Sequence, residues 1–441
     1  MPAASNPPSS AALRIAIIGG GIAGVNLALG LQARNLPFTL YERASGFREI
    51  GAGIGFSPNS ERAMGILNPD VLATFKRVAN PNNEDYFRWA NGYETDEIFF
   101  SLHLGKDGFQ GARRSDILEE WARLIPDDKV VFGREVDHID DNDDEGLTIK
   151  FKDGTTADAD VVIGCDGIRS RIRQLVLPPK DPQSKVPNPA AIPHYSSKFC
   201  FRALVPMDAA FSALGPDRAL KRVMYNGPSA HIVSYPVGNN SVLNVLVVLS
   251  DPLPWPDAYK HTARGSRSEA VASFADWQPS SRKIVDLLPE QMDKWAIFDM
   301  YEHPAPTYVR ERVCVAGDAA HAMGPHLGAG GGMGIEDALA LSAVLERVEE
   351  AVARGGAATS KKEAVERALR AYEEVRYERT QKIVRLTREA VDLMEWKDPE
   401  ASRDADGFGS AITEMFHYIW NYDVEAMVDE AVRSFDRGKA A

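Results

Sequence analysis

Residues 15–42 read IAIIGGGIAGVNLALGLQARNLPFTLYE, and this stretch decides the fold class of the chain. Four apolar residues of strand character lead into the turn Gly19-x-Gly21-x-x-Gly24, a helical stretch, and a second strand that ends at Glu42. Gly19 permits a tight turn, Gly21 lets the backbone approach a pyrophosphate, and Gly24 lets helix and strand pack closely. The helix N-terminus supplies free N–H groups for phosphates, and Glu42 would bind the ribose hydroxyls. We therefore predict a dinucleotide-binding βαβ unit.

Composition and charge narrow the class of protein. The chain has 441 residues, of which 44% are hydrophobic and 26% are charged, as in a soluble globular protein with two or three domains or one large interwoven unit. Its formal net charge of −13 argues against nucleic acid and anionic lipid as partners, since both need a basic face. The acidity is interpreted as a contribution to solubility.

The N-terminal region and the cysteines indicate where the protein resides. Residues 1–12 form a leader rich in Pro, Ser and Ala without a basic region, and the apolar run after it is only as long as a strand. We therefore expect a disordered leader, and neither a signal peptide nor a membrane span. Cys165, Cys200 and Cys314 are far apart and form no C-x-x-C pair, which indicates neither disulfides nor a thiolate metal site. A cytoplasmic protein without a metal is expected.

Two further glycine-containing motifs follow the βαβ unit. The cluster 49–55, EIGAGIG, has glycine at alternate positions, and this suggests backbone that lies against a flat ligand, with Gly53 as a candidate contact. The buried-type strand 160–165 runs into Asp166-Gly167-x-x-Ser170-x-x-Arg173, where a helix is expected to begin.

A third motif lies late in the chain. A strand ends at Gly317-Asp318, and the glycine-rich stretch 325–334 follows before a long helix that we expect from about Ile335 to Val352. Because ligand crevices lie at the carboxyl ends of parallel strands, Asp318 is expected to face such a crevice.

These three motifs, in this order, resemble the FAD-dependent aromatic hydroxylases of the para-hydroxybenzoate hydroxylase type. The resemblance covers roughly residues 13–380. Within that family, the runs 317–330 and 334–338 resemble salicylate hydroxylases and also the fungal hydroxylases that dearomatise resorcinol-type polyketides.

The resemblance implies an α/β (α+β) fold, in which a Rossmann-like FAD-binding domain carries an inserted strand-rich substrate domain and C-terminal helices. Alternating apolar residues between 199 and 249 support a strand-rich second domain. The expected division is a leader at 1–12, an FAD-binding domain at 13–70, 108–180 and 298–375, a substrate domain at 71–107 and 190–297, and a C-terminal helical segment at 376–441.

The resemblance also implies FAD as the cofactor and NAD(P)H as the reductant. The residues that would hold the ADP half of FAD are Gly19, Gly21, Gly24, Glu42 and Arg43. Arg114 would reach the pyrophosphate or ribityl region, and Asp318 the ribityl chain. Asp166 and Gly167 are expected to serve both FAD and NAD(P)H.

The stretch from Pro325 to Gly332 would lie along the isoalloxazine ring. Its candidate contacts are Pro325, Gly328, Ala329, Gly330 and Gly331. The helix after it would direct its N-terminus at the flavin N1/C2=O edge, where the dipole stabilises an anionic reduced flavin by on the order of 1 kcal/mol. Many relatives have Gln where this chain has Leu327, and an amide residue where it has Gly332 or Met333, so polar contacts to the ring are expected to differ.

Only one stretch of the chain has the strict glycine spacing, which argues against two-domain disulfide reductases and fits an NAD(P)H that docks transiently. The resemblance implies that the reduced flavin reacts with O₂ to form a C4a-hydroperoxide, which the protein shields from water. Oxygen transfer from such a species needs an electron-rich ring, so a small aromatic substrate held as a phenolate is expected.

Three residues are candidates for contact with that substrate. Arg202 and Tyr235 match an arginine and a tyrosine that face the substrate in the dearomatising fungal relatives, and His326 matches a histidine near the substrate of salicylate hydroxylases. Taken alone, Arg202 also fits a strand arginine that faces solvent, and Tyr235 a core aromatic residue. His321 is expected to be structural, as are Arg376 and Arg379, which lie at i,i+3 spacing on one helix face.

The leading hypothesis is a single-component flavin monooxygenase that hydroxylates a phenolic ring, with a resorcinol-type polyketide and oxidative dearomatisation favoured by Arg202 and Tyr235. The alternative within this class is a salicylate 1-monooxygenase that forms catechol. A flavin-dependent halogenase would need Trp-x-Trp-x-Ile-Pro, but none of the seven tryptophans has another two places away. The motifs at Asp166 and Asp318 argue against a non-catalytic FAD protein.

The sequence leaves open the phenolic substrate, the position hydroxylated, the choice between NADH and NADPH, and the oligomeric state. The aromatic segment 388–422 fits either a homodimer face or packing against its own domain.

Overall fold

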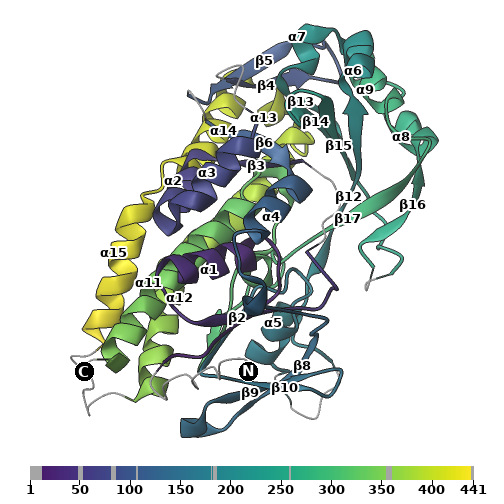
Figure 1. Ribbon diagram of the computed structural model, residues 1–441. Coiled ribbons are helices and arrows are strands. Elements are labelled where there is room, and N and C mark those ends of the chain that lie inside the picture. Colours follow the sequence, from purple (N-terminus) through teal and green to yellow (C-terminus); the bar gives the residue numbers. More distant parts are fainter. Residues whose placement is uncertain are drawn as a thin grey trace, which may run out of the picture.

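The computed structural model describes residues 12–47, 53–80, 86–105, 108–179, 181, 186–257, 260–353 and 360–438. Residues 1–11 of the expected leader, and residues 49–52 of the second glycine cluster, lie outside this part of the chain. The described chain forms two large sheets with a layer of long helices between and beside them (Figure 1). Figure 1 places the eight-stranded sheet at the upper right and the long helices at the centre and left.

The first sheet is built around the βαβ unit predicted from residues 15–42. Its strand order is β18-β19-β11-β1-β2-β7, and all its neighbouring pairs are parallel except β18 with β19. The strands are β1 (Ile15–Ile18), β2 (Phe38–Glu42), β7 (Val130–Phe132), β11 (Val161–Gly164), β18 (Val309–Arg310) and β19 (Val313–Val315). Because β1, β2, β11 and β19 run in the same direction, the motifs that follow them meet at one edge of the sheet.

Long helices pack beside this sheet. α1 (Ile22–Ala33) lies along α11 (Gly330–Ala353), and α12 (Lys361–Met394) packs on α11 in turn (Figure 1). The other helices of this part are α2 (Pro58–Leu67), α3 (Pro69–Val78), α4 (Arg114–Ala122), α5 (Arg171–Val176), α10 (Asp318–His321) and α15 (Val424–Arg437). A small antiparallel sheet of β8 (Val136–Asp141), β9 (Leu147–Phe151) and β10 (Thr156–Ala159) completes it.

The second large sheet has the order β16-β17-β12-β15-β14-β13-β4-β5. Its strands are β4 (Tyr86–Asn91), β5 (Ile98–His103), β12 (His194–Pro206), β13 (Arg222–Gly227), β14 (Ala230–Val237), β15 (Val242–Ser250), β16 (Thr262–Ser266) and β17 (Gln291–Asp299). One face, with Phe201, Tyr225, Ile232 and Val247, is buried against the region of α6 (Met207–Leu214), α8 (Arg267–Ser273) and α9 (Pro279–Asp286); the short α7 (Pro216–Ala219) lies beside α6.

The opposite face of the second sheet looks toward the helices. Its apolar side chains, including Trp89 and Met224, form a core with α12 and α14 (Ala405–Trp420), next to α13 (Pro399–Arg403). Phe416 and Trp420 are buried in this core, and Trp396 is buried at the end of α12. These aromatic residues of the segment 388–422 therefore pack against their own chain.

The helix expected from about Ile335 begins earlier, at Gly330. Gly330 to Gly332 are thus the first turn of α11 rather than part of a loop. Glycine has a low helix propensity, so the sequence pattern predicts a helix that starts only at the apolar residues after the glycines. Packing requires glycine here, since a Cβ on Gly332 would lie 2.0 Å from the Oγ of Ser60.

The α/β fold class with a parallel nucleotide-binding-type sheet and a second strand-rich sheet is confirmed. The domain boundaries stay a prediction, although α12 runs without interruption across the boundary expected at residue 376. Within the described ranges, no helix is long and apolar enough to cross a membrane.

Candidate active site

Two adjoining cavities lie where the motifs converge. The larger, about 380 Å³, lies between the eight-stranded sheet and the start of α11, and the smaller, about 290 Å³, lies at the carboxyl edge of β1, β2 and β11. Gly21, Arg114, Cys165 and Gly167 line both. The two cavities therefore form one elongated site.

The smaller cavity is closed at one end by the loop after β2. The Glu42 carboxylate accepts backbone N–H groups from Gly20 at 2.7 Å and Ala44 at 2.8 Å, which fixes its position. A carboxylate has about four lone-pair sites, so acceptor capacity remains for ligand hydroxyls. Gly21 precedes α1 without any side-chain cap, so the N-terminus of α1 has uncapped N–H groups at the cavity wall.

Asp166 and Gly167 form the part of the wall next to the glycine turn, where a Cβ on Gly19 would lie 2.8 Å from the Asp166 Cα. Asp166 Oδ2 accepts the N–H groups of Arg171 at 2.7 Å and Ile172 at 3.1 Å, and Oδ1 accepts the Ser170 hydroxyl. Burial raises the pKa of Asp166 despite these hydrogen bonds. Asp166 thus holds the start of α5, while Gly167, at φ 78°, exposes its backbone to both cavities.

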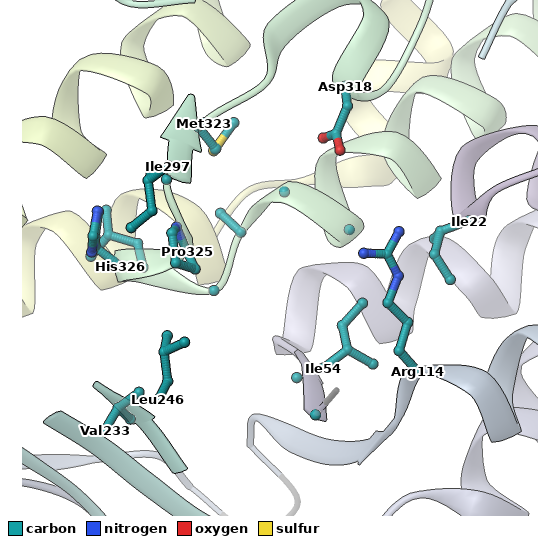
Figure 2. Close-up of a pocket in the computed structure, with 18 of the residues that line it drawn as sticks. Ile22, Ile54, Arg114, Val233, Leu246, Ile297, Asp318, Met323, Pro325 and His326 are labelled. Atoms are coloured by element: carbon teal, nitrogen blue, oxygen red, sulfur yellow. The ribbon is translucent and has the colours of Figure 1, made fainter. Parts of the chain in front are cut away.

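The upper wall of the larger cavity is the segment from β19 to α11 (Figure 2). Asp318 begins α10 and its side chain is exposed into the cavity, where a Cβ on Gly330 would be 3.9 Å from Asp318 Oδ1. Pro325 begins a short 3₁₀ turn, Pro325–Leu327, and Gly328 follows in the left-handed region at φ 62°. The segment therefore presents backbone rather than side chains to a flat ligand.

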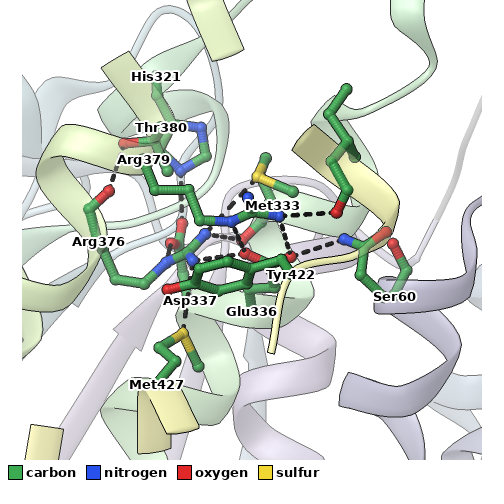
Figure 3. Close-up of polar contacts among 12 residues, drawn as sticks. Ser60, His321, Met333, Glu336, Asp337, Arg376, Arg379, Thr380, Tyr422 and Met427 are labelled. Carbon is green, nitrogen blue, oxygen red and sulfur yellow. Dashed lines mark hydrogen bonds and ion pairs between the residues drawn. The ribbon is translucent and has the colours of Figure 1, made fainter. Parts of the chain in front are cut away.

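A buried ion cluster holds the start of α11 in place (Figure 3). Asp337 Oδ2 accepts the Gly317 N–H at 2.8 Å and is 2.6 Å from His321 Nε2, and its Oδ1 accepts Arg376 Nε at 2.7 Å. Burial opposes ionisation, but His321 and Arg376 outweigh it and hold the pKa of Asp337 well below its usual range. This cluster ties the β19 turn to the helix that borders the cavity.

Glu336 extends the cluster to the other side of α11. Arg379 Nε donates to Glu336 at 2.8 Å, and the Asn59 amide donates to it at 2.7 Å from α2. His321, Arg376 and Arg379 thus contact two buried carboxylates, in line with the structural roles expected for them.

The floor of the larger cavity is the inner face of the eight-stranded sheet. Tyr235 pairs with Asn244 on the neighbouring strand β15. On its other side, the register Val223–Ser234 places Arg222 of β13 opposite Tyr235. Arg222, Tyr235 and Asn244 thus form a polar row across the sheet. The next row along the strands is apolar and consists of Met224, Val233 and Leu246, with Arg202 at its end. Figure 2 shows Val233 and Leu246 facing Ile297, Pro325 and His326 across the cavity.

Tyr235 and Arg202 both reach this cavity. Burial raises the pKa of Tyr235 to about 12, although the charges of Arg202 and Arg222 oppose the rise, so the phenol is a neutral donor near pH 7. A Cβ on Gly53 would lie 2.7 Å from the Tyr235 hydroxyl, which explains glycine there. Arg202 is exposed, lines the cavity, and stacks over Trp295 with its guanidinium carbon 5.4 Å from the ring centroid.

His326 is buried beside the floor, with its Nδ1 unpartnered among the described residues. Burial and the neighbouring His231, whose ring is 5.3 Å away, hold the pKa of His326 well below its usual value. His231 Nδ1 in turn lies 3.0 Å from Glu395 Oε1. His326 is therefore a neutral ring.

Nearly all the candidate residues border the two cavities. The smaller is lined by Gly19, Gly21, Glu42, Arg43, Arg114, Asp166 and Gly167. The larger is lined by Gly21, Gly53, Arg114, Gly167, Arg202, Tyr235, Asp318, Pro325, His326, Gly328, Ala329, Gly330 and Gly331. Gly24 borders neither, since a Cβ there would lie 1.9 Å from the carbonyl oxygen of Gly19. Gly24 instead allows the close packing of α1 against the turn after β1.

Sequence reasoning missed four polar residues of the larger cavity, Arg222, His231, Asn244 and His261. The alternation of β14 could have placed His231 on the same face as Tyr235. Arg222 and Asn244 could not be placed without the register between strands.

Comparison with known proteins assigns this geometry to a family. A family model described as an FAD binding domain matches residues 12–187 and 207–387. The FAD-dependent monooxygenase orf3 of Aspergillus niger is 45% identical over 440 residues, which cover 97% of this chain and 98% of the relative. The FAD-dependent monooxygenase pigN of Monascus ruber is 47% identical over 432 residues, which cover 96% and 97%.

The chain belongs to the FAD-dependent monooxygenases. A solved salicylate hydroxylase in complex with its substrate has a TM-score of 0.82 and 28% identity, and the alignment covers 96% of this monooxygenase and 98% of that chain.

The residues present fit FAD. The paired cavities are elongated, the N-terminus of α1 faces them without a capping side chain, and Glu42 lies fixed at one end. The glycine-lined start of α11 faces the other end. The monooxygenase thus has one continuous place for the ADP half and the flavin half.

Proposed function

We propose that this monooxygenase is a single-component enzyme that uses NAD(P)H and O₂ to hydroxylate an electron-rich phenol, a resorcinol-type polyketide that is dearomatised in the reaction. One observation carries the proposal. Arg202 and Tyr235, a permanent cation and a neutral donor, border an apolar strip on the cavity floor that faces the glycine-rich wall. A phenolate on that strip would have its oxygen within reach of both groups.

FAD would span the two cavities. Glu42, Gly19, Gly21 and Arg43 would hold the ADP half, Arg114 the pyrophosphate or ribityl region, and Asp318 the ribityl chain. The wall of Pro325, Gly328, Ala329, Gly330 and Gly331, together with Gly53 on the other side, would hold the flavin ring. FAD supplies the two-electron chemistry that activates O₂. Asp166 and Gly167 are proposed to serve the approach of NAD(P)H as well.

The protein's own groups would prepare the phenol. Arg202 lowers the pKa of the bound phenol by stabilising its anion, and Tyr235 donates a hydrogen bond to the same oxygen. Met224, Val233 and Leu246 exclude water from the ring that is attacked. His326, neutral and buried, would offer a hydrogen-bonding nitrogen at the far side of the strip.

Decarboxylative hydroxylation of salicylate is the second candidate. It is favoured by the similarity to the solved salicylate hydroxylase and by the position of His326 in the cavity.

Product analysis with two phenols separates the candidates. FAD-loaded protein is incubated with NAD(P)H and either 2,4-dihydroxy-3-methylbenzaldehyde or salicylate. The methyl-bearing ring carbon of the aldehyde cannot regain aromaticity by losing a proton once it is hydroxylated. The proposal predicts a product of the aldehyde that has gained one oxygen and lost its aromatic absorbance. Catechol and CO₂ from salicylate alone would favour the second candidate, and no product from either would contradict both.

A further inference from the structure

Arg222 is a buried arginine at the floor of the larger cavity. It begins β13, is 5% exposed, and lines the cavity beside Tyr235. On its other side the parallel β4 places Phe87 next to it. Apolar side chains and the polar row thus surround a guanidinium group that solvent hardly reaches.

The other buried arginines of the described chain all have partners. Arg376 and Arg379 pair with Glu336, and Arg312 pairs with Asp141. Arg173 donates to the carbonyl groups of Ala190, Ala319 and Ala320. Within this set, Arg222 alone makes no hydrogen bond or ion pair, and its Nε is buried without an acceptor.

The described surroundings of Arg222 do little to offset its charge. Burial lowers the pKa of Arg222 to about 10, and Tyr235 is the one group that acts in the opposite direction. Among the residues described along the cavity, Arg114, Arg202 and Arg222 are cationic and Asp318 is the one carboxylate. A buried ion without a partner is costly, and a ligand that brings an anion removes this cost.

We propose that Arg222 binds a second anionic group of the substrate, a carboxylate or an acidic phenolate, apart from the phenolate oxygen at Arg202. Arg222 and Arg202 lie on β13 and β12, which β14 and β15 separate. Strands are about 4.8 Å apart, so the two backbones are about 14 Å apart, and both side chains enter the cavity between them. The substrate therefore carries a second acceptor group, separate from the phenolate oxygen that Arg202 and Tyr235 share, on an aromatic body that lies on Met224, Val233 and Leu246.

This inference rests on the proposed function, because it places the aromatic ring of the substrate on the apolar strip. Two probes test it directly: 2,4-dihydroxybenzoate and its neutral isostere 2,4-dihydroxybenzamide. Their dissociation constants are measured by the change in flavin absorbance of FAD-loaded protein in the wild type, Arg222→Gln, Arg222→Lys and Arg202→Gln.

Wild-type protein should bind the benzoate at least about 10-fold more tightly than the benzamide. Arg222→Gln should remove this preference, Arg222→Lys should restore part of it, and Arg202→Gln should weaken both probes while keeping the preference. An unchanged preference in Arg222→Gln would overturn the inference. So would a loss of FAD from Arg222→Gln, because the arginine would then hold the cofactor.

Thermal unfolding supplies a readout that does not depend on the reaction. Since Arg222 has no partner among the described residues, Arg222→Met should unfold at or above the wild-type temperature, and 2,4-dihydroxybenzoate should raise that temperature only in the wild type. A marked fall in the unfolding temperature of Arg222→Met would contradict the inference.

If Arg222 controls the preference but no phenol is hydroxylated, the proposed function fails and the inference stands. If phenols are hydroxylated and Arg222→Gln behaves as wild type, the inference alone fails.

Discussion

Arg202 and Tyr235 differ in their exposure to solvent and in the residues that they contact. Arg202 is partly open to solvent and lies over Trp295, whereas Tyr235 is held against Gly53 on a central strand. Both are in the protonation state that stabilises a phenolate, the arginine as a permanent cation and the tyrosine through a pKa raised to about 12. The site would therefore stabilise the substrate anion without a proton transfer to either group.

Replacing Arg202 by Gln should lower kcat/KM for the phenol by about 10²- to 10³-fold, because a preorganised cationic donor to an oxyanion is lost. FAD content should stay at the wild-type level, since Arg202 is assigned to the substrate end. Steady-state NAD(P)H oxidation against substrate concentration measures the change. A loss below about 3-fold would remove Arg202 from the proposed role.

The same variant should also change the pH profile. The wild-type rate should rise with pH at a value below the pKa of the free phenol, because Arg202 favours the anion, and Arg202→Gln should move this rise to higher pH by about one unit or more. Tyr235 stays protonated below about pH 11, given its pKa of about 12, so it should cause no alkaline loss up to pH 10. Identical acid limbs in the two proteins would contradict this assignment.

Tyr235→Phe should cost less than the arginine variant, about 10-fold to 100-fold in kcat/KM, since one hydrogen bond to a charged oxygen is worth about 1.5–3 kcal/mol. The hydroxyl lies next to Gly53, so the smaller Phe should leave the fold unchanged. Steady-state kinetics and near-ultraviolet circular dichroism together test both statements. Wild-type kinetics in this variant would show that Tyr235 is a core aromatic residue only.

Among the helices and strands of the site, the start of α11 is held in position by the buried ion cluster. Glu336 and Asp337 lie about two turns inside the helix, and they bind Arg376 and Arg379 from α12 and His321 from α10. Glycine at the first turn gives little helix propensity of its own. The cluster and the packing against α1 therefore hold the cavity wall.

Asp337→Asn should lower the free energy of unfolding by about 3–5 kcal/mol, because it removes one of the two buried counter-charges of Arg376 and the carboxylate that contacts the His321 ring. It should also weaken FAD binding, since Asp337 accepts the Gly317 N–H that positions the turn before Asp318. Chemical denaturation and FAD titration measure the two effects. The matched control is Glu366→Gln, which breaks an exposed pair with Arg370 on α12 and should change neither quantity. Equal behaviour of the two variants would contradict this role of the cluster.

The elements also show what could be read from the sequence. The turn from Gly19 to Gly24, and the carboxylates Asp166 and Asp318, are local signals whose meaning depends on the next few residues, and they lie at one sheet edge as predicted. Arg222 could not be assigned, because its place depends on which strand pairs with β13 and in which register. The start of α11 was also missed, since tertiary contacts, not propensity, put Gly330 in a helix.

At the scale of the whole molecule, a second buried network joins the C-terminal helices to the large sheet. Glu395, at the end of α12, contacts His231 on β14, Lys198 on β12 and Ser250 on β15. Burial opposes ionisation of Glu395, but His231 and Lys198 outweigh it and lower its pKa to about 2. The carboxylate thus connects the sheet that forms the cavity floor to the helix that carries Arg376.

This network should make the protein sensitive to acid. Because the pKa of Glu395 is about 2 in the folded state and about 4.5 in the unfolded chain, its ionised form stabilises the fold above about pH 4.5, and this contribution is lost as the pH falls toward 2. Glu395→Gln should therefore reduce stability at pH 7 by roughly 3 kcal/mol and flatten the decline below pH 4.5. Denaturant unfolding at several pH values measures this.

Asp392→Asn is the control for that experiment, since Asp392 lies on the same helix and forms a surface pair with Lys397. Its unfolding curve should follow that of the wild type throughout the pH range. The network would have no stabilising role if Glu395→Gln had the same free energy of unfolding as the control at pH 7 and lost stability in the same way at low pH.

We propose that the paired cavities hold FAD and a phenol so that one oxygen atom of O₂ is transferred to the ring. Isotopically labelled O₂ tests it most directly, with purified FAD-loaded protein, NAD(P)H and 2,4-dihydroxybenzaldehyde, followed by mass analysis of the product. We expect NAD(P)H oxidation that the phenol stimulates and a product with one labelled oxygen atom, both strongly reduced in Arg202→Gln. Oxidation of NAD(P)H that yields only hydrogen peroxide with every phenol tested, or a product without label, would contradict it.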